Sequence, residues 1–266
     1  MPKQFLPTTA AVTVAIIFGL SFLFTKETLQ YLSPFQLLGL RFALAALSLT
    51  LLVACRLVRL RIRLQHLPGL LKIALWQPVL YFLCETYGVK LTTASESGVV
   101  IALVPVAVTV LSIFILGEKI TARQGACIGL AVAGVMLMAL ASSSNGGGES
   151  KFHLLGILLL FGAVMAGGFY NIFSRQASTE YPPLDITFVM MWLGALVFNA
   201  AGLTQSYLTG QMGNYYTALQ HLPAAAGLVY LGLLSSVLGF LLLNYALSRM
   251  TASRTAVFLN LIPVVS

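Results

Sequence analysis

The stretch KLTTASESGVVIALVPVAVTV, residues 90–110, returns in outline as RMTASRTAVFLNLIPVVS, residues 249–266. Shifting the second stretch back by 158 residues places Pro263 on Pro105 and gives eight identities in the 20 positions from 87 to 106. Tyr, Thr, Ser and Pro are among the matched types, and a lipid-facing composition does not favour them. We therefore infer an internal repeat. The identical pairs are Tyr87 and Tyr245, Thr93 and Thr251, Ala94 and Ala252, Ser95 and Ser253, Val99 and Val257, Leu103 and Leu261, Pro105 and Pro263, and Val106 and Val264.

The composition indicates a membrane protein. Of the 266 residues, 59% are hydrophobic and only 8% are charged, and the mean hydropathy is +0.94. A helix needs about 20 mostly apolar residues to cross a bilayer, and several stretches of this chain meet that length. We therefore predict an all-α polytopic membrane protein.

Charges, prolines and Gly/Ser clusters divide the chain into eight complete spans and the start of a ninth. The only low-complexity linker, ASSSNGGGES, separates the fifth span from the sixth. We therefore expect a first five-helix repeat at 1–141, a flexible linker at 142–151 and a second repeat at 152–266. The expected helices are 8–31, 35–54, 68–90, 94–116, 121–141, 153–174, 184–207, 223–247 and one that begins at 251.

A repeat of five helices has an odd number of crossings, so the second half should enter the membrane inverted relative to the first. A weaker match at a shift of 149 residues agrees, because it pairs Lys26 with Arg175, which fall on opposite sides. Inverted repeats are typical of secondary transporters. Under the 158-residue shift, roughly 33 residues would follow Ser266. We therefore expect a fragment that ends within its ninth helix and lacks the tenth.

The basic residues predict a cytoplasmic N-terminus in a cell membrane, plasma or bacterial inner, because basic loops stay in the cytoplasm. Of the 15 Lys and Arg residues, eleven collect on one side, three on the other, and Arg41 lies inside the second helix. The net charge of +8 thus reflects topology, and no nucleic-acid partner is expected. The eleven are Lys3, Arg56, Arg59, Arg61, Arg63, Lys72, Lys119, Arg123, Arg175, Arg249 and Arg254, and the three are Lys26, Lys90 and Lys151.

Other function classes lack their motifs. No phosphate-binding glycine loop is present, and His66, His153 and His221 are widely separated in the sequence. We therefore expect no enzyme, no metal and no cofactor. The alternative to transport is a membrane scaffold or assembly protein that moves nothing, although a scaffold needs neither symmetric proline-containing helices nor charges inside the bilayer.

Three segments resemble the EamA-type family of the drug/metabolite transporter superfamily. They are residues 18–47, residues 92–121 and the glycine-spaced helix GACIGLAVAGVMLM at 125–138. The most specific features are Arg41 after Pro34, the S-E-S pattern before Pro105, and LGEKIT around Glu118. The resemblance covers the whole chain and implies ten helices in two inverted repeats and transport of small metabolites, commonly export. The missing tenth helix departs from the family pattern.

Charged groups within spans are costly and mark a pathway or a pair. Arg41 in the second helix and Glu85 in the third are such groups, and both lie in the outer part of the bilayer. They can form a structural or gating ion pair, or contact substrate or a coupling proton, or Glu85 can simply reach the outer interface. Pro105 and Pro263, near mid-bilayer, are candidate hinges because proline breaks one backbone hydrogen bond.

Polar and aromatic side chains on the remaining helices are candidates for a substrate cavity. Asparagine within a span needs a partner, either another helix or a ligand. The candidates are Ser21, Trp76, Tyr81, Tyr170, Asn171, Asn244, Tyr245 and Asn260. Interhelical packing remains the alternative for each of them, and tyrosine or tryptophan near the end of a span also serves as an interface anchor.

These observations favour a secondary carrier that works by alternating access between two halves. We expect it to export amino acids or related compounds, with the lipid bilayer, a small-molecule substrate and a coupling proton as its partners. The sequence leaves the identity of the substrate open, and it is compatible with a monomer.

Overall fold

A computed structural model describes residues 5–116, 126, 129–130, 133–134, 150–210, 219–259 and 261–265. These residues form helices and no strand, and seven of the helices are long and apolar enough to cross a membrane. The all-α polytopic membrane fold predicted from the composition is therefore confirmed. The expected linker at 142–151 and most of the expected helix at 121–141 lie outside the described residues.

The helix bounds follow the sequence prediction closely. The first helix runs three residues ahead of its expected bounds at both ends, and Ser33 then caps the second helix by accepting a hydrogen bond from the Gln36 amide. The first half contains α1 (Phe5–Thr28), α2 (Pro34–Ala54), η1 (Leu64–His66), α3 (Leu67–Ala74), η2 (Leu75–Leu80), α4 (Tyr81–Leu91), α5 (Ala94–Ile101) and α6 (Val104–Leu116). The second half contains α8 (Ser150–Ala177), α9 (Pro183–Leu208), α11 (Leu222–Val229), η3 (Tyr230–Gly239), α12 (Phe240–Arg249), α13 (Ala252–Leu259) and α14 (Ile262–Val265).

Several spans expected as single helices are interrupted at proline. Pro78, Pro105 and Pro263 lie four residues after the last residues of α3, α5 and α13, which are Ala74, Ile101 and Leu259. Proline has no backbone N–H, and its ring clashes with the carbonyl four residues earlier, so the regular helix ends there. The break in the third span is the sharpest, because Gln77 has extended backbone angles, φ −147° and ψ 116°. The eighth span departs from α-helical geometry over η3, without a proline.

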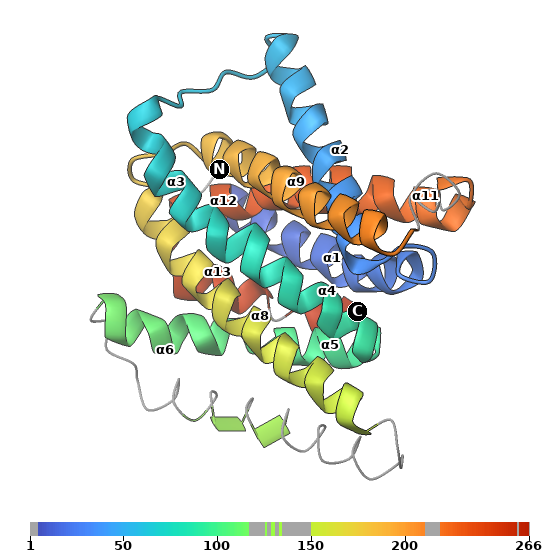
Figure 1. Cartoon of the computed structure of the whole chain (residues 1–266). Coiled ribbons are helices and arrows are strands. Elements are labelled where there is room, and N and C mark those ends of the chain that lie inside the picture. Colours follow the sequence, from blue (N-terminus) through green and yellow to red (C-terminus); the bar gives the residue numbers. More distant parts are fainter. Residues whose placement is uncertain are drawn as a thin grey trace.

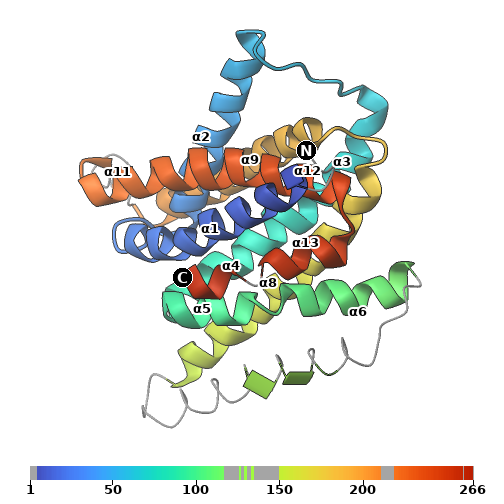
Figure 2. The ribbon, with the colours of Figure 1, turned by 180° about the vertical axis from the view of Figure 1, so that it is seen from behind.

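The element boundaries recur at the shift found in the sequence. Adding 158 to the first and last residue numbers of α5 gives those of α13. Adding 158 to the number of the first residue of α6 gives that of the first residue of α14. Interhelical contacts also come in matched pairs: α4 packs on α8 as α12 packs on α1, and α6 contacts α13 as α14 contacts α5. Figures 1 and 2 show α1 beside α12, and the C-terminus beside α5. The inverted orientation of the two halves stays a prediction.

Close helix approaches repeat at the level of single residues. A Cβ added to Gly19 in α1 would lie 2.6 Å from the Cβ of Val265 in α14, and one added to Gly168 in α8 would lie 3.0 Å from the Cβ of Ala107 in α6. Gly168 is the counterpart of Gly19 at the 149-residue shift, and Ala107 is the counterpart of Val265 at the 158-residue shift. The same small-residue packing therefore joins the first and fourth helices across the two halves.

Candidate functional site

A cavity lies among the interrupted helices and draws its lining from both halves. It has charged and polar groups on one part of its wall and aromatic rings on the rest. Such a mixture is typical of sites for small molecules, which combine an apolar lining with a few fixed polar groups. The lining residues are Phe18, Ser21, Phe22, Arg41, Gln77, Tyr81, Phe82, Glu85, Ile101, Ser235, Phe240 and Ile262.

Positions that the 158-residue shift makes counterparts meet at this cavity. Phe82 and Phe240, 158 residues apart, both line it, and so do Gln77 and Ser235, which are separated by the same number. Ile101 and Ile262 belong to the turns where α5 ends and α14 begins. The breaks in the helices thus border the cavity.

Arg41 is buried in the cavity wall, with 1% of its surface exposed. Its Nε donates a hydrogen bond of 2.8 Å to the Ser236 hydroxyl, and its Nη2 donates one of 2.9 Å to the Ser235 hydroxyl. The guanidinium carbon lies 4.3 Å from the centroid of the Phe82 ring, within range of a cation–π interaction. The guanidinium is therefore held in one orientation by η3 and α4.

Glu85 lines the same cavity from α4 and is also buried, with 2% exposed. Its Oε2 accepts a hydrogen bond of 3.2 Å from the Thr86 hydroxyl. Within the described part of the chain, no ion pair joins Glu85 to Arg41, so the direct pair considered from the sequence is not formed. Both charges instead face one space from separate elements.

Only some of the residues proposed for the cavity lie on it. Ser21 and Tyr81 do, and the Ser21 hydroxyl donates to the Phe18 carbonyl at 2.7 Å. Trp76 is not among the lining residues, because its ring stacks on Phe169 of α8 with centroids 4.4 Å apart. The break at η2 therefore turns Gln77, rather than Trp76, toward the cavity.

Tyr170 and Asn244 belong to a buried packing cluster away from the cavity lining. The Asn244 Oδ1 accepts hydrogen bonds from Tyr170 at 2.6 Å and from Ser174 at 2.8 Å. Its Nδ2 donates to the Thr187 hydroxyl at 2.9 Å, and all four side chains are at most 1% exposed. This asparagine thus finds its partners on α8 and α9, the packing alternative that the sequence left open.

The remaining candidates are scattered. Asn171 donates to the Gly167 carbonyl at 2.7 Å, and its buried Oδ1 has no hydrogen-bond partner in the described part of the chain. Tyr245 is half-buried on α12 and is not among the lining residues, and Asn260 lies outside the described residues. Pro105 is buried in α6, and Pro263 lies in α14, each just after a helix break.

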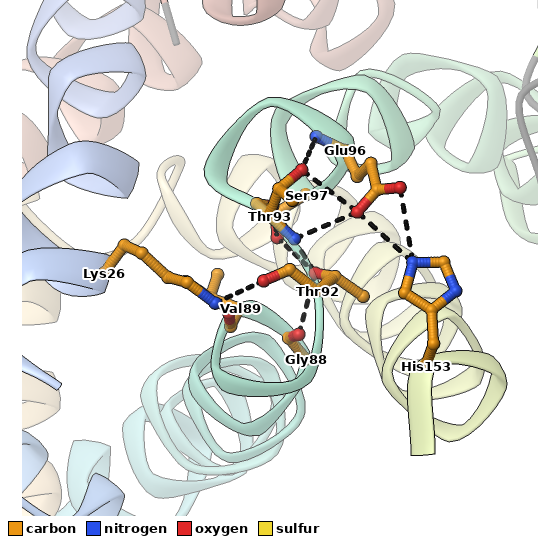
Figure 3. A network of polar contacts seen from close by, with 8 residues as sticks. All are labelled: Lys26, Gly88, Val89, Thr92, Thr93, Glu96, Ser97 and His153. Carbon is orange, nitrogen blue, oxygen red and sulfur yellow. Dashed lines mark hydrogen bonds and ion pairs between the residues drawn. The ribbon is translucent and has the colours of Figure 1, made fainter. Parts of the chain in front are cut away.

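A polar network closes one end of the first half (Figure 3). Lys26 of α1 donates to the Val89 carbonyl at 2.8 Å and to the Thr92 carbonyl, so it caps the last turn of α4. Glu96 accepts a hydrogen bond from the Thr93 amide at 3.0 Å, and its carboxylate lies 3.2 Å from the His153 Nε2. These contacts tie α1, α4, α5 and α8 together.

The second half has a matching cap at its own end. Arg175 of α8 donates to the Leu247 carbonyl at 2.8 Å. Arg175 is the counterpart of Lys26 at the 149-residue shift, and Leu247 is the counterpart of Val89 at the 158-residue shift. In Figure 1 the turn after α1 lies at the right of the bundle and the turn after α8 at the left. The two caps thus sit at opposite ends.

Sequence reasoning missed much of the cavity lining. Phe82 and Phe240 carried a usable signal, because they are identical at the 158-residue shift. Gln77 and Ser235 carried none, since Gln77 is a lone polar residue in an apolar run and Ser235 is one of two adjacent serines in another. The missed lining residues are Phe18, Phe22, Gln77, Phe82, Ile101, Ser235, Phe240 and Ile262.

This chain is similar to a known protein family, to several named proteins and to a solved structure. The EamA-like transporter family matches residues 7–140 and 154–266. An "Uncharacterized transporter YcxC" of Bacillus subtilis is 32% identical over 97% of this chain and 81% of that protein. A "Probable amino-acid metabolite efflux pump" of Salmonella typhimurium is 26% identical over 96% of this chain and 82% of that protein. A solved crystal structure shares the fold with a TM-score of 0.63 at 19% identity, over 97% of this chain and 86% of that one.

Proposed function

Since the chain belongs to the EamA-like transporter family, we propose that it is a secondary carrier that exports amino acids or related small metabolites. The observation that carries this proposal is the cavity, which is lined by counterpart positions of the two halves and bordered by interrupted helices. Secondary carriers place their substrate sites at such repeat interfaces, on broken helices.

Alternating access between inverted repeats is the proposed mechanism. Lys26 and Arg175 make matching caps at opposite ends of the bundle. If the second half is inverted, one cap faces each side of the membrane, and exchanging the conformations of the two halves opens one end while closing the other. Pro105 and Pro263 are the proposed hinges, because each helix is already interrupted just before its proline.

The amino-acid substrate class draws on the named relatives. Besides the Salmonella protein, a "Probable terminal-alkyne amino-acid exporter" of Streptantibioticus cattleyicolor is 28% identical over 65% of this chain and 54% of that protein. The cavity agrees in character, since a cation and a carboxylate share it with aromatic rings. We place the carrier in the cell membrane with its N-terminus in the cytoplasm, on the asymmetry of its basic residues.

A proton gradient is the proposed driving force. Glu85 is a buried carboxylate on the cavity and so can bind and release a proton where substrate enters.

Reconstitution in liposomes tests the proposed function. Liposomes loaded with a mixed pool of amino acids and other small metabolites are sampled by mass spectrometry for the compounds that leave, with and without a pH gradient. We expect selective loss of amino acids compared with protein-free liposomes. No selective loss, from protein shown to be folded by its thermal unfolding, would instead favour the scaffold alternative.

A further inference from the structure

We propose that Arg41 and Glu85 bind the two charged ends of one zwitterionic ligand, the carboxylate at Arg41 and the ammonium at Glu85, with its apolar side chain against the aromatic wall. This inference rests on the proposed function and goes further, because it assigns each end of an amino acid to a residue.

The guanidinium of Arg41 is positioned with donors to spare. Nε and Nη2 each make one hydrogen bond, to Ser236 and Ser235, and the Phe82 ring covers one face. No hydrogen bond within the described residues uses Nη1. A guanidinium has five N–H donors in a fixed plane, and the unused ones on Nη1 and Nη2 match the two oxygens of a carboxylate. Arg41 is thus prepared for an anionic group without moving.

Glu85 is likewise only partly engaged. Its Oε2 accepts from the Thr86 hydroxyl, and no hydrogen bond within the described residues ends on its Oε1. An ionised carboxylate can accept several hydrogen bonds, and a ligand ammonium has three to donate. The remaining acceptor positions of Glu85 therefore suit an ammonium group.

Two buried opposite charges that do not pair call for an explanation. Taking a charge out of water is costly, and a close partner normally offsets part of that cost. Here Arg41 and Glu85 share a cavity, yet no ion pair joins them. A zwitterion between them supplies a counter-charge to both at once, whereas a ligand with one charge leaves the other side chain without its partner.

The rest of the wall defines the third feature of the ligand. Phe18, Phe22, Phe240, Ile101 and Ile262 present apolar surface. Burial of an apolar side chain against such a wall is favourable by about 25 cal/mol per Å². The ligand class is therefore an amino acid with an aliphatic or aromatic side chain.

The asymmetry of the repeat supports a single binding orientation. The counterpart of Arg41 at the 149-residue shift is Met190, and the counterpart of Glu85 at the 158-residue shift is Leu243. The second half therefore offers the cavity no equivalent charged pair. An amino acid between the halves has one set of charged partners, all on the first repeat.

Ligand binding to the purified full chain tests the assignment. The probes are L-phenylalanine, 3-phenylpropionate, which lacks the ammonium, and phenethylamine, which lacks the carboxylate, with L-leucine, 4-methylpentanoate and 3-methylbutylamine as the aliphatic set. We expect the wild type to bind at least one amino acid roughly tenfold or more tightly than its two analogues, since each bidentate or charged contact that is lost costs about that factor. Equal affinities within both sets, or binding of neither amino acid, would overturn the proposal.

Substitutions then assign the ends. Arg41→Gln removes the proposed carboxylate partner, so this variant should bind the amino acid no more tightly than the amine that lacks the carboxylate. Glu85→Gln removes the proposed ammonium partner, so this variant should bind the amino acid no more tightly than the acid that lacks the ammonium. Tyr170→Phe, a buried change in the packing cluster, serves as the control and should preserve both preferences. Equal weakening of all three probes by both variants would indicate a structural role and sink the assignment. If a variant does not fold, the wild-type affinities for the six probes still decide.

The outcome separates this inference from the proposed function. Liposome export of amino acids by the wild type, together with equal affinities for the probes, would leave the carrier standing and remove the zwitterion assignment. Binding with the expected preferences but without any export would support the zwitterion assignment and remove the proposed carrier function.

Discussion

The rings of Phe82 and Phe240, which stand 158 residues apart in the sequence, meet edge to face with centroids 5.9 Å apart and planes at 65°. Both line the cavity, one at the start of α4 and the other at the start of α12. If the two halves are related by an axis, as the sequence repeat predicts, two counterpart residues can touch each other only near it. This contact then predicts that the cavity lies at the centre of the repeat arrangement, where a relative movement of the halves would change its shape.

Phe82 makes a contact that Phe240 does not make, because the Phe82 ring lies under the guanidinium of Arg41. A cation–π interaction of this kind is worth about 0.5–2 kcal/mol. We predict that Phe82→Leu lowers the melting temperature of the detergent-solubilised protein further than Phe240→Leu does. Phe198→Leu, which disturbs the stacked pair of Phe198 and Phe42, should lower it without weakening ligand binding. Equal shifts for the two cavity variants would contradict the cation–π contribution.

The fold could be predicted largely from the sequence because its signals are local. Apolar length sets a span, and proline cannot continue the backbone hydrogen bonding of a helix. Pro105 and Pro263 are therefore candidate hinges in spans otherwise expected to be single helices, and in the structure a regular helix ends four residues before each of them. The shapes of the third and eighth spans could not be predicted so well, since the extended backbone of Gln77 in the third and the departure from α-helix over η3 in the eighth depend on how neighbouring helices pack.

The cavity could be predicted only in part because the rotation of each helix about its own axis depends on its neighbours. Arg41 and Glu85 stood out because a charge in a span is rare. Asn244 stood out because it is a polar side chain within a span. Its side chain nevertheless turns toward α8 and α9 and packs there. Ser235 and Ser236 gave no signal, since serine is common in membrane helices, and only the structure shows them bonded to the guanidinium.

Asn244 makes three hydrogen bonds to buried side chains, and their loss should be visible in stability. A buried donor or acceptor left unpaired costs about 1–3 kcal/mol. Asn244→Ala orphans the partners Tyr170, Ser174 and Thr187, so we predict a drop in the free energy of unfolding of about 3 kcal/mol or more. Tyr170→Phe removes one of these bonds and should lower it less. Export per folded molecule, measured in liposomes, should stay near wild type, and a selective loss of export would place Asn244 in the transport path instead.

Asn171 should behave in the opposite way. Its Oδ1 is buried without a partner in the described part of the chain, so Asn171→Ala removes an unsatisfied acceptor and costs less stability than Asn244→Ala. The assignment of Asn171 and Asn260 to the substrate cavity stays a prediction from the sequence, and it requires that Asn171→Ala and Asn260→Ala lower substrate flux more than they lower the amount of folded protein. Flux from liposomes and folded yield by size-exclusion chromatography give the two numbers. Equal losses of both would assign these residues to packing.

The two caps predict mirror-image effects on accessibility. Thr92 and Met250 are counterparts at the 158-residue shift, and both are buried next to a cap. With Cys55, Cys84 and Cys127 replaced by serine, Thr92→Cys and Met250→Cys report on the two ends. Lys26→Met should raise labelling by a membrane-impermeant maleimide at position 92 and leave position 250 unchanged, and Arg175→Met should do the reverse.

The same labels test the orientation of the repeats. If the halves are inverted, the reagent reaches position 92 from outside the cell and position 250 only after the membrane is opened. Labelling of both positions from one side would show that the halves are not inverted, whatever the effect of the cap variants.

Glu85 is the residue on which proton coupling is proposed to depend. A carboxylate that exchanges a proton with the cavity makes export sensitive to the pH gradient, and its amide analogue cannot carry that proton. We predict that an acidic exterior accelerates export by the wild type at least severalfold, and that Glu85→Gln exports at a rate independent of the gradient. Because Glu85 is also the proposed ammonium partner, each variant must be compared at amino-acid concentrations that saturate it, so that weaker binding is not mistaken for lost coupling. Glu27→Gln, which removes an exposed carboxylate at the end of α1, is the matched control and should keep the wild-type response. An unchanged response in Glu85→Gln would move the coupling site away from the cavity.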